Sequence, residues 1–337
     1  MRRTLVSFLF LLLGLSFLVF LIWKEGAEGI FALLQHAGWP LLWLLPVHVV
    51  VIGLDAVSWR WLLGGQERPC LFKLTCLALL REAINALLPV ARIGGELVGI
   101  RLLSHMGVSL YRAAASVLVE VSLTLLSQFF FTVLGVLLLL MWISDLQVLK
   151  LLLIPLLLSL PILLLIFWLL GRANVFQSLQ RLLLRFGGER GLLRLPGDPA
   201  LLDQEIQRLY ARRWQLLIAN AWQLASLFAG ALEVWLSFRL LHHPISLTAA
   251  VLLESLGQAL RNASFFIPAS LGVQEGGFVL FGAIVGVGPE LALAYSLVRR
   301  FRELLLGIPL LLSWYLWEGK VAITAWQGRR VSGGSRI

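Results

Sequence analysis

Long runs of apolar residues recur along the whole chain, and their length limits the fold more than any other feature. A run of about 18 residues or more crosses a hydrocarbon layer of about 30 Å as a helix rising about 1.5 Å per residue. Apolar residues make up 59% and charged residues 14% of the 337 positions, and the mean hydropathy is +0.90. Because soluble domains carry about 25% charged residues, these values predict an all-α, polytopic integral membrane protein, with residues 1–337 forming a single membrane domain.

The runs predict about six transmembrane helices. The first run follows Arg2 and Arg3, is longer than the apolar core of a cleaved signal peptide and lacks a good cleavage site, so we expect it to remain as a helix. The six predicted crossings are Leu5–Trp23, Trp39–Leu63, Ala113–Trp142, Leu149–Leu170, Trp214–Leu240 and Leu291–Trp317.

Two further apolar regions, Leu74–Leu103 and Ala249–Val287, are each interrupted midway by proline and glycine. The breaks follow Pro89 in the first region and Pro268 in the second, and each half is too short to cross a membrane alone. Irregular backbone at membrane depth is tolerated only where it is buried in protein or lines a watery cavity. We therefore predict two re-entrant helical hairpins.

The basic residues predict the orientation. The net charge is +10, and the arginines lie mostly beside apolar runs, where the positive-inside rule explains them without nucleic acid. The stretch 172–213 is rich in arginine and is predicted to be a cytoplasmic connector, in which Asp198 and Pro199 begin a helix that extends to Tyr210. With six crossings and two hairpins, both termini and the connector lie in the cytoplasm.

The two hairpin regions belong to an internal repeat. Pro268 lies as far beyond Pro89 as Glu275 lies beyond Glu96, and the same constant offset pairs Arg60 with Arg239 and Gly107 with Gly286. The predicted repeats span about 40–126 and about 219–305, and the topology above makes them inverted. Inverted repeats with broken helices are typical of membrane translocators whose ligand site lies near the membrane midplane. The alternative is a duplication that only built a stable bundle.

Ionisable side chains inside the apolar regions are the candidate functional residues, because each costs about 2.5–3.5 kcal/mol at membrane depth. The offset maps Glu120 onto Arg299, and we expect these two to approach each other, either as a structural ion pair or at a ligand or gating site. Glu96 and Glu275 stand in the first turns of predicted helices, where an acid either stabilises the helix or binds a cationic headgroup or a proton. The candidate substrate-binding residues are Arg81, Asn85, Arg92, Glu96, Glu120, Asn262, Gln274, Glu275, Arg299, Arg302 and Glu303.

Motifs of catalysis and metal binding are absent from the sequence. It contains no GxxxxGK[ST] loop for ATP, no GxSxG or HExxH motif, and no acidic run of the DDxxD type. The five histidines form no metal-binding motif, and Cys70 and Cys76 are spaced too simply for a zinc site or a disulfide framework. We expect no enzymatic activity, no cofactor and no metal.

Two stretches resemble a known family. The segment from Arg81 to Pro89 with Gly94-Gly95-Glu96, and the segment from Phe266 to Gly277, are similar to the flippase-like transmembrane domain of lysyl-phosphatidylglycerol synthases. The second segment and the run 299–307 resemble the branch associated with bacterial hopanoid biosynthesis. The resemblance implies a multi-pass protein of the bacterial inner (cytoplasmic) membrane and lipid translocation. We expect no lysyl-lipid synthesis, because the large soluble aminoacyl-transferase domain of the full synthases is not in this sequence.

The sequence therefore predicts a protein that moves a polar lipid, a hopanoid or a phospholipid, between leaflets, with membrane lipids and lipid-biosynthesis enzymes as partners. A secondary transporter of a small anionic solute and a non-transporting scaffold for lipid-synthesis enzymes are the alternatives. A lateral opening toward lipid favours the first role, a closed watery pocket the second, and the lack of a polar cavity the third. The sequence does not identify the lipid, the direction, the energy source or the oligomeric state.

Overall fold

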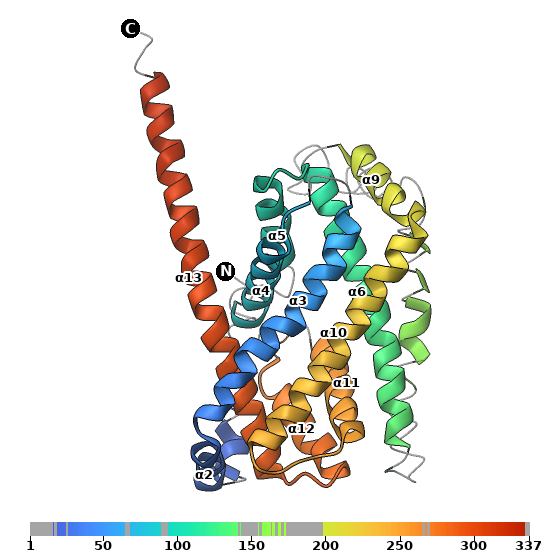
Figure 1. Ribbon diagram of the computed structural model, residues 1–337, viewed down its shortest axis with the longest axis vertical. Coiled ribbons are helices and arrows are strands. Elements are labelled where there is room, and N and C mark those ends of the chain that lie inside the picture. Colours follow the sequence, from blue (N-terminus) through green and yellow to red (C-terminus); the bar gives the residue numbers. More distant parts are fainter. Residues whose placement is uncertain are drawn as a thin grey trace.

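The computed structural model of the chain is a bundle whose described elements are all helices (Figure 1). It describes residues 19–24, 26–64, 68–88, 94–140, 198–264 and 270–333, with backbone alone for 318–333, and also 16, 142, 154, 157–162, 164–165, 168–169, 172 and 267. The elements are α2 (Ala27–Ala37), η1 (Trp39–Trp43), α3 (Leu44–Leu63), α4 (Leu71–Leu87), α5 (Gly94–His105), α6 (Leu110–Leu139), α9 (Pro199–Ala211), α10 (Arg213–Leu240), α11 (Leu247–Ala263), α12 (Val273–Ile284) and α13 (Pro289–Gly333).

Three described helical segments are long and apolar enough to cross a membrane, namely Trp39–Leu63, Leu110–Leu139 and Arg213–Leu240. They confirm three of the predicted crossings. The predicted crossing Leu5–Trp23 lies largely outside the described residues, and half of the predicted crossing Leu149–Leu170 does. The sixth, Leu291–Trp317, lies within the 45-residue helix α13 but is interrupted by a cluster of charged side chains. The full layout of six crossings and two membrane hairpins stays a prediction.

Each predicted hairpin region contains two short helices. Helices α4 and α11 have 17 residues each, and α5 and α12 have 12 residues each. Leu88 leaves α4 in an extended conformation (φ −106, ψ 145), as expected for the residue before a proline, because the proline ring disfavours helical backbone there. Pro89, Arg92 and Pro268 themselves lie outside the described residues. Figure 1 shows α4–α5 in the upper half of the bundle and α11–α12 in the lower half.

The turns that follow the two hairpins have the same geometry. Gly107 and Gly286 both adopt left-handed backbone (φ 93 and φ 80), which only glycine reaches at no steric cost. The next residue in each turn donates its N–H back across the helix end, Val108 to the carbonyl of Leu103 and Val287 to that of Gly282. The two turns are related by the offset that relates Pro89 to Pro268. The repeat boundaries themselves stay a prediction.

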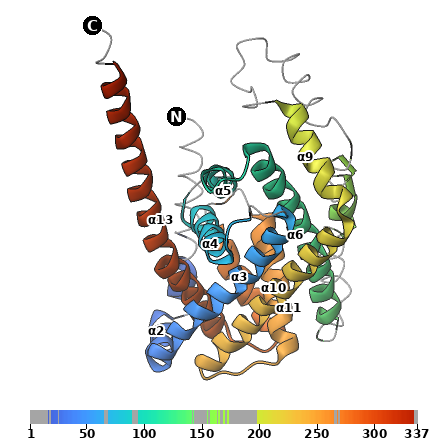
Figure 2. The same cartoon turned by 45° about the horizontal axis from the view of Figure 1, so that its top comes forward.

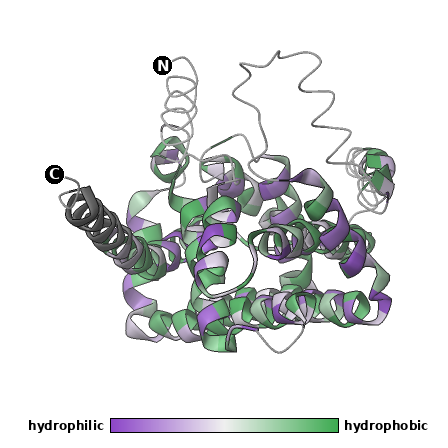
Figure 3. Ribbon diagram, turned by 90° about the horizontal axis from the view of Figure 1, so that it is seen from above, coloured by the Kyte–Doolittle hydropathy of each residue, from purple (hydrophilic) through white to green (hydrophobic). Residues whose placement is uncertain are grey.

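Helices from the two halves of the chain pack against each other throughout the bundle. Helix α3 packs along α10, α11 packs against α6, and α4 packs against α13, so each hairpin lies on the long helix that follows the other hairpin. One apolar core surrounds α4 and α5 and includes Trp59 and Leu103, and another surrounds α11 and α12 and includes Phe238 and Phe278. Seen from above, most of the helices carry both hydrophobic and hydrophilic residues (Figure 3).

The connector helix α9 lies against α6 at the end of the bundle (Figure 2). Its start agrees with the sequence, because the side chain of Asp198 accepts a hydrogen bond from the N–H of Ala200 at 2.9 Å and Pro199 occupies the first turn. The rest of the predicted connector, apart from Arg172, lies outside the described residues up to position 197.

Candidate functional site

A polar cavity of about 540 Å³ lies where the inner ends of the two hairpins face each other. This volume is within the range of about 300–1,000 Å³ that is usual for small-molecule sites. Its walls come from α3, α4, α5, α6, α11, α12 and α13. The polar lining residues are Asp55, Arg81, Glu82, Asn85, Glu96, Glu120, Thr124, Gln128, Gln258, Arg261, Asn262, Gln274, Arg300 and Glu303.

Arg81 is the centre of the first ion-pair cluster in this cavity. Its Nη2 donates to Glu120 Oε2 at 2.8 Å and also to Glu96, and its guanidinium lies 4.5 Å from the centre of the Trp59 ring. Asn85 Nδ2 donates to Glu96 at 3.3 Å. Arg81 is only 8% exposed, so the two carboxylates supply the neutralisation that a buried guanidinium requires. Glu96 therefore does more than stabilise the start of a helix.

Close packing of α5 on α4 depends on glycine. The N–H of Gly95 donates to Asn85 Oδ1 at 3.0 Å, and a Cβ at position 95 would lie 2.5 Å from the backbone oxygen of Arg81. A Cβ at Gly99 would lie 2.8 Å from the side chain of Arg81. Any larger residue would push α5 away and separate Glu96 from Arg81.

The second hairpin holds its glutamate, Glu275, in a different way. Glu275 is 0% exposed, and its Oε1 accepts a hydrogen bond from Arg300 Nε of α13 at 2.9 Å. Arg300 also donates to Glu303 at 3.2 Å. Gln274 is buried in the cavity wall, and its Nε2 has no hydrogen-bond partner among the described residues. Asn262 Nδ2 donates to Gln128 Oε1 at 2.6 Å.

The predicted approach of Glu120 and Arg299 is wrong for this structure. Glu120 binds Arg81, whereas Arg299 Nη1 donates to Glu254 Oε2 at 2.9 Å and to the hydroxyl of Tyr295 at 3.3 Å. The physical reason is that each charge already meets an opposite charge on a hairpin helix. Equivalence in the repeat does not specify how the helices rotate about their axes.

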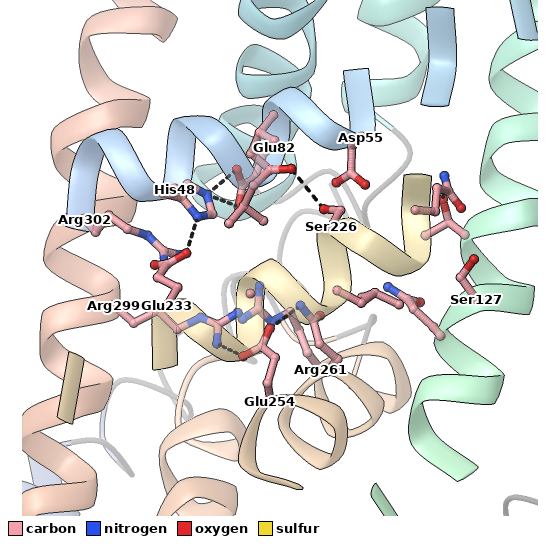
Figure 4. Close-up of a pocket in the computed structure, with 18 of the residues that line it drawn as sticks. His48, Asp55, Glu82, Ser127, Ser226, Glu233, Glu254, Arg261, Arg299 and Arg302 are labelled. Carbon is pink, nitrogen blue, oxygen red and sulfur yellow. Dashed lines mark hydrogen bonds and ion pairs between the residues drawn. The ribbon is translucent and has the colours of Figure 1, made fainter. Parts of the chain in front are cut away.

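Two neighbouring hollows extend the polar cavity. The inner chamber, of about 110 Å³, shares Asp55, Glu82 and Arg261 with it (Figure 4). There the ring of His48 contacts carboxylates from two helices, Nδ1 to Glu233 Oε2 at 2.9 Å and Nε2 to Glu82 Oε2 at 2.9 Å. Arg302 forms an ion pair with Glu233.

The apolar groove, of about 580 Å³, lies between α13 and the segment formed by α2, η1 and α3. It is bordered by Leu34, Gly38, Trp39, Leu41, Leu42, Leu44, Leu45, Leu297, Val298, Arg300, Phe301, Arg302, Leu304 and Leu305. Arg300 also lines the polar cavity, and Arg302 also lines the inner chamber. Arg302 is 6% exposed, and its Nε and Nη2 have no hydrogen-bond partner within the described part of the chain.

Carboxyl groups outnumber guanidinium groups around the polar cavity and the inner chamber. An uncompensated buried charge is costly at low dielectric, so this surplus must be met by bound protons or by a cationic group. The carboxyl groups are Asp55, Glu82, Glu96, Glu120, Glu233, Glu254 and Glu303, and the guanidinium groups are Arg81, Arg261, Arg299, Arg300 and Arg302.

Nine of the predicted residues line the polar cavity or the inner chamber, Glu275 lies beside them in its ion pair with Arg300, and Arg92 lies outside the described residues. Sequence reasoning did not select His48, Asp55, Glu82, Glu233, Glu254, Arg261 or Arg300 as site residues. A signal was available for some, because His48, Asp55 and Glu233 each interrupt an otherwise apolar crossing, where an ionisable residue indicates function. Among the described residues, no group of three or more His, Cys, Asp or Glu side chains is arranged to hold a metal ion.

Long apolar helices around a charged interior, with two interrupted hairpins facing each other, define a helical integral membrane protein. The chain belongs to the family described as the lysylphosphatidylglycerol synthase TM region, whose model matches residues 5–310. No curated protein and no solved structure matches the chain significantly.

Proposed function

We propose that this protein moves a polar lipid between the leaflets of the inner (cytoplasmic) membrane. The headgroup occupies the polar cavity, and the hydrocarbon chains stay in apolar surroundings. The chain acts in transport and makes or breaks no covalent bond. Its termini and the connector that includes α9 lie on the cytoplasmic side, in keeping with the arginine distribution.

The observation that carries the proposal is the position of Arg300, which borders both the polar cavity and the apolar groove. Moving a hydrocarbon chain into water costs about 0.8 kcal/mol per CH₂ group. A lipid translocator therefore needs a charged path that is joined along its side to an apolar one. A transporter of a small water-soluble anion needs only the polar cavity, and a scaffold needs neither hollow.

The placement of the hairpins supports alternating access. Their inner ends line one cavity, and their outer ends lie in opposite halves of the bundle (Figure 1). Separation of α4–α5 from the cavity opens it toward one side, and separation of α11–α12 opens it toward the other. Discontinuous helices meeting at a repeat interface serve this purpose in other transporters.

The buried N–H groups of Arg302 favour a lipid with a phosphate group. Guanidinium groups bind phosphate through several charge-assisted hydrogen bonds, and two donors of Arg302 have no partner among the described residues. Arg302 borders the inner chamber and the apolar groove beside the polar cavity, so a phospholipid whose phosphate reaches these donors fits better than a hopanoid that lacks phosphate. Bound protons must then offset the surplus of carboxyl groups, because the phosphate adds a further negative charge. The hopanoid remains the alternative lipid class, suggested by the resemblance of the 266–277 and 299–307 segments.

Reconstituted vesicles test the function directly. The purified full chain is placed in liposomes with headgroup-labelled phosphatidylglycerol in the inner leaflet, and arrival of the label in the outer leaflet is followed by chemical quenching. We expect movement well above that in protein-free vesicles, and a loss of about tenfold or more in Arg300→Gln. Arg239→Gln is the matched control, because Arg239 is exposed at the end of α10. No movement of any labelled phospholipid or hopanoid by a folded protein would overturn the proposal.

A further inference from the structure

His48 sits between two carboxylates in the inner chamber. The ring comes from α3, Glu82 comes from α4 and Glu233 comes from α10, so one side chain joins three helices (Figure 4). Each ring nitrogen lies 2.9 Å from a carboxylate oxygen. His48 is only 7% exposed, so bulk water does not compete for these contacts.

The number of protons in this arrangement follows from the chemistry of its groups. An ionised carboxylate can only accept hydrogen bonds, and a neutral imidazole carries a single N–H. With neutral imidazole, one of the two nitrogen–oxygen contacts would bring two lone pairs together at 2.9 Å. Both contacts are hydrogen bonds only when the three groups share one additional proton.

The additional proton belongs on the imidazole. Glu233 also binds Arg302, which holds it ionised, and the side chain of Glu82 is 30% exposed toward the polar cavity. The charged groups around His48 come from α3, α4, α10, α11 and α13, whereas α6 contributes only the uncharged Thr124, Ser127 and Gln128. The acidic ones are Asp55, Glu82, Glu233 and Glu254, and the basic ones are Arg261, Arg299 and Arg302. The hydroxyl of Tyr295 on α13 also borders the chamber.

We propose that His48 is the binding site of a coupling proton, and that this proton drives the movement of the lipid. Loss of the proton turns one of the two contacts into a repulsive one. Because Arg302 still holds Glu233, the contact that breaks is that to Glu82. The part of α4 that carries Glu82 is then released from His48 of α3, while the apolar core around Trp59 keeps the two helices packed. Glu82 lines the polar cavity, so this release changes access to the headgroup site. That the transported molecule is a lipid rests on the proposed function, whereas the proton-binding site at His48 does not.

Nuclear magnetic resonance of the full chain in lipid nanodiscs tests the proton site without any transport. With ¹⁵N-labelled histidine, the signals of His48 are those missing from His48→Gln. Spectra are recorded from pH 5 to pH 8, and we expect both ring nitrogens to carry protons at the acidic end and one of them to lose its proton as the pH rises. A ring that keeps one bare nitrogen over this whole range would overturn the proposal.

A second variant keeps the test valid if His48→Gln folds poorly. In Glu82→Gln the amide can donate to a neutral ring nitrogen, so the additional proton is no longer required. We expect His48 in this variant to hold its second proton only at lower pH than in the native chain. An unchanged titration of His48 would show that Glu82 does not share the proton, against the proposal.

Transport under a pH gradient tests the coupling. If one proton accompanies one lipid, a gradient of one pH unit drives about a tenfold difference in labelled phosphatidylglycerol between the leaflets. His48→Gln is expected to abolish this difference, whereas the control His105→Gln, at the exposed end of α5, retains it. If the native protein moves the lipid equally with and without the pH gradient, the proposed coupling is overturned. A doubly protonated His48 without lipid movement would support the proton site and contradict the proposed function instead.

Discussion

The two hairpins have helices of equal length but hold their glutamates in different ways. In the first hairpin, Glu96 of α5 is bound by Arg81 and Asn85 of α4, so the ion pair lies inside the hairpin. In the second, Glu275 of α12 is bound by Arg300 of α13, outside the hairpin. The two hairpins therefore have similar helices but different ion-pair partners. As a consequence, moving α12 away from α13 breaks a buried ion pair, whereas the ion pair of the first hairpin stays within it.

The two glutamates also differ in the exposure of their side chains. The side chain of Glu96 is 23% exposed, whereas that of Glu275 is 0% exposed. The first hairpin thus presents its carboxylate to the polar cavity, and the second keeps it against α13. We infer that α4–α5 moves as a unit with its charges paired, and that α11–α12 is held closed by Arg300.

The largest expected effect comes from removing the cation of the first hairpin. Arg81→Met leaves the buried Glu120 and the half-buried Glu96 without their shared partner, and breaking a buried pair in this way costs about 3–5 kcal/mol. Thermal unfolding of the purified protein measures it. A stability within about 0.5 kcal/mol of the native chain would show that the Arg81 cluster does not hold the hairpin together.

Removing the cation of the second hairpin is expected to destabilise the protein less. Arg300→Met deletes the charge-assisted hydrogen bond to Glu275, worth about 1.5–3 kcal/mol, while Glu303 keeps Arg299 at 4.0 Å. The Arg300 side chain is also more exposed than that of Arg81. Because the pair bridges the hairpin to α13, protease cleavage near α12 should accelerate more than cleavage near α5. Equal acceleration at both hairpins would remove the distinction between them.

Gly95 sharpens the comparison further, because the equivalent position of the second hairpin is Gln274. Gly95→Ala places a methyl group against the backbone oxygen of Arg81, and such overpacking costs about 1–3 kcal/mol. Unfolding of this variant in detergent measures the cost. A native stability for Gly95→Ala would mean that α4 and α5 are not packed as closely as described.

The smallest effect on stability is expected for Gln274→Ala. The Nε2 atom of Gln274 has no hydrogen-bond partner among the described residues, so its removal should change the free energy of unfolding by less than about 0.5 kcal/mol. Movement of labelled phosphatidylglycerol should nevertheless fall several-fold, because that donor faces the headgroup site. Full transport by this variant would assign Gln274 no role in binding.

Local chemistry made part of this fold predictable. Apolar length predicted the crossings at α3, α6 and α10, the Asp198–Pro199 pair predicted the start of α9, and Pro89 predicted the end of α4. The polar centre was predictable in part for a similar reason, since charges in apolar regions are costly and therefore few. Arg81, Glu96 and Glu275 were found in this way.

The partners of these charges were not predictable. Which residue each arginine meets depends on how the helices rotate and pack, and several opposite charges were available at similar spacing. The expected Glu120–Arg299 pair failed for this reason. His48 was overlooked because it has no neighbouring ligands in the sequence, whereas α4 and α10 bring Glu82 and Glu233 to it from far along the chain.

The central claim is that the polar cavity carries the lipid headgroup while the adjoining apolar groove holds the hydrocarbon chains. It is tested most directly by giving the same proteoliposomes two labelled probes, phosphatidylglycerol and its chain-free analogue glycerophosphoglycerol. We predict that the lipid crosses between leaflets in a manner that depends on Arg300, while the soluble analogue stays where it was added. Uptake of the soluble analogue with no movement of the lipid would contradict the account.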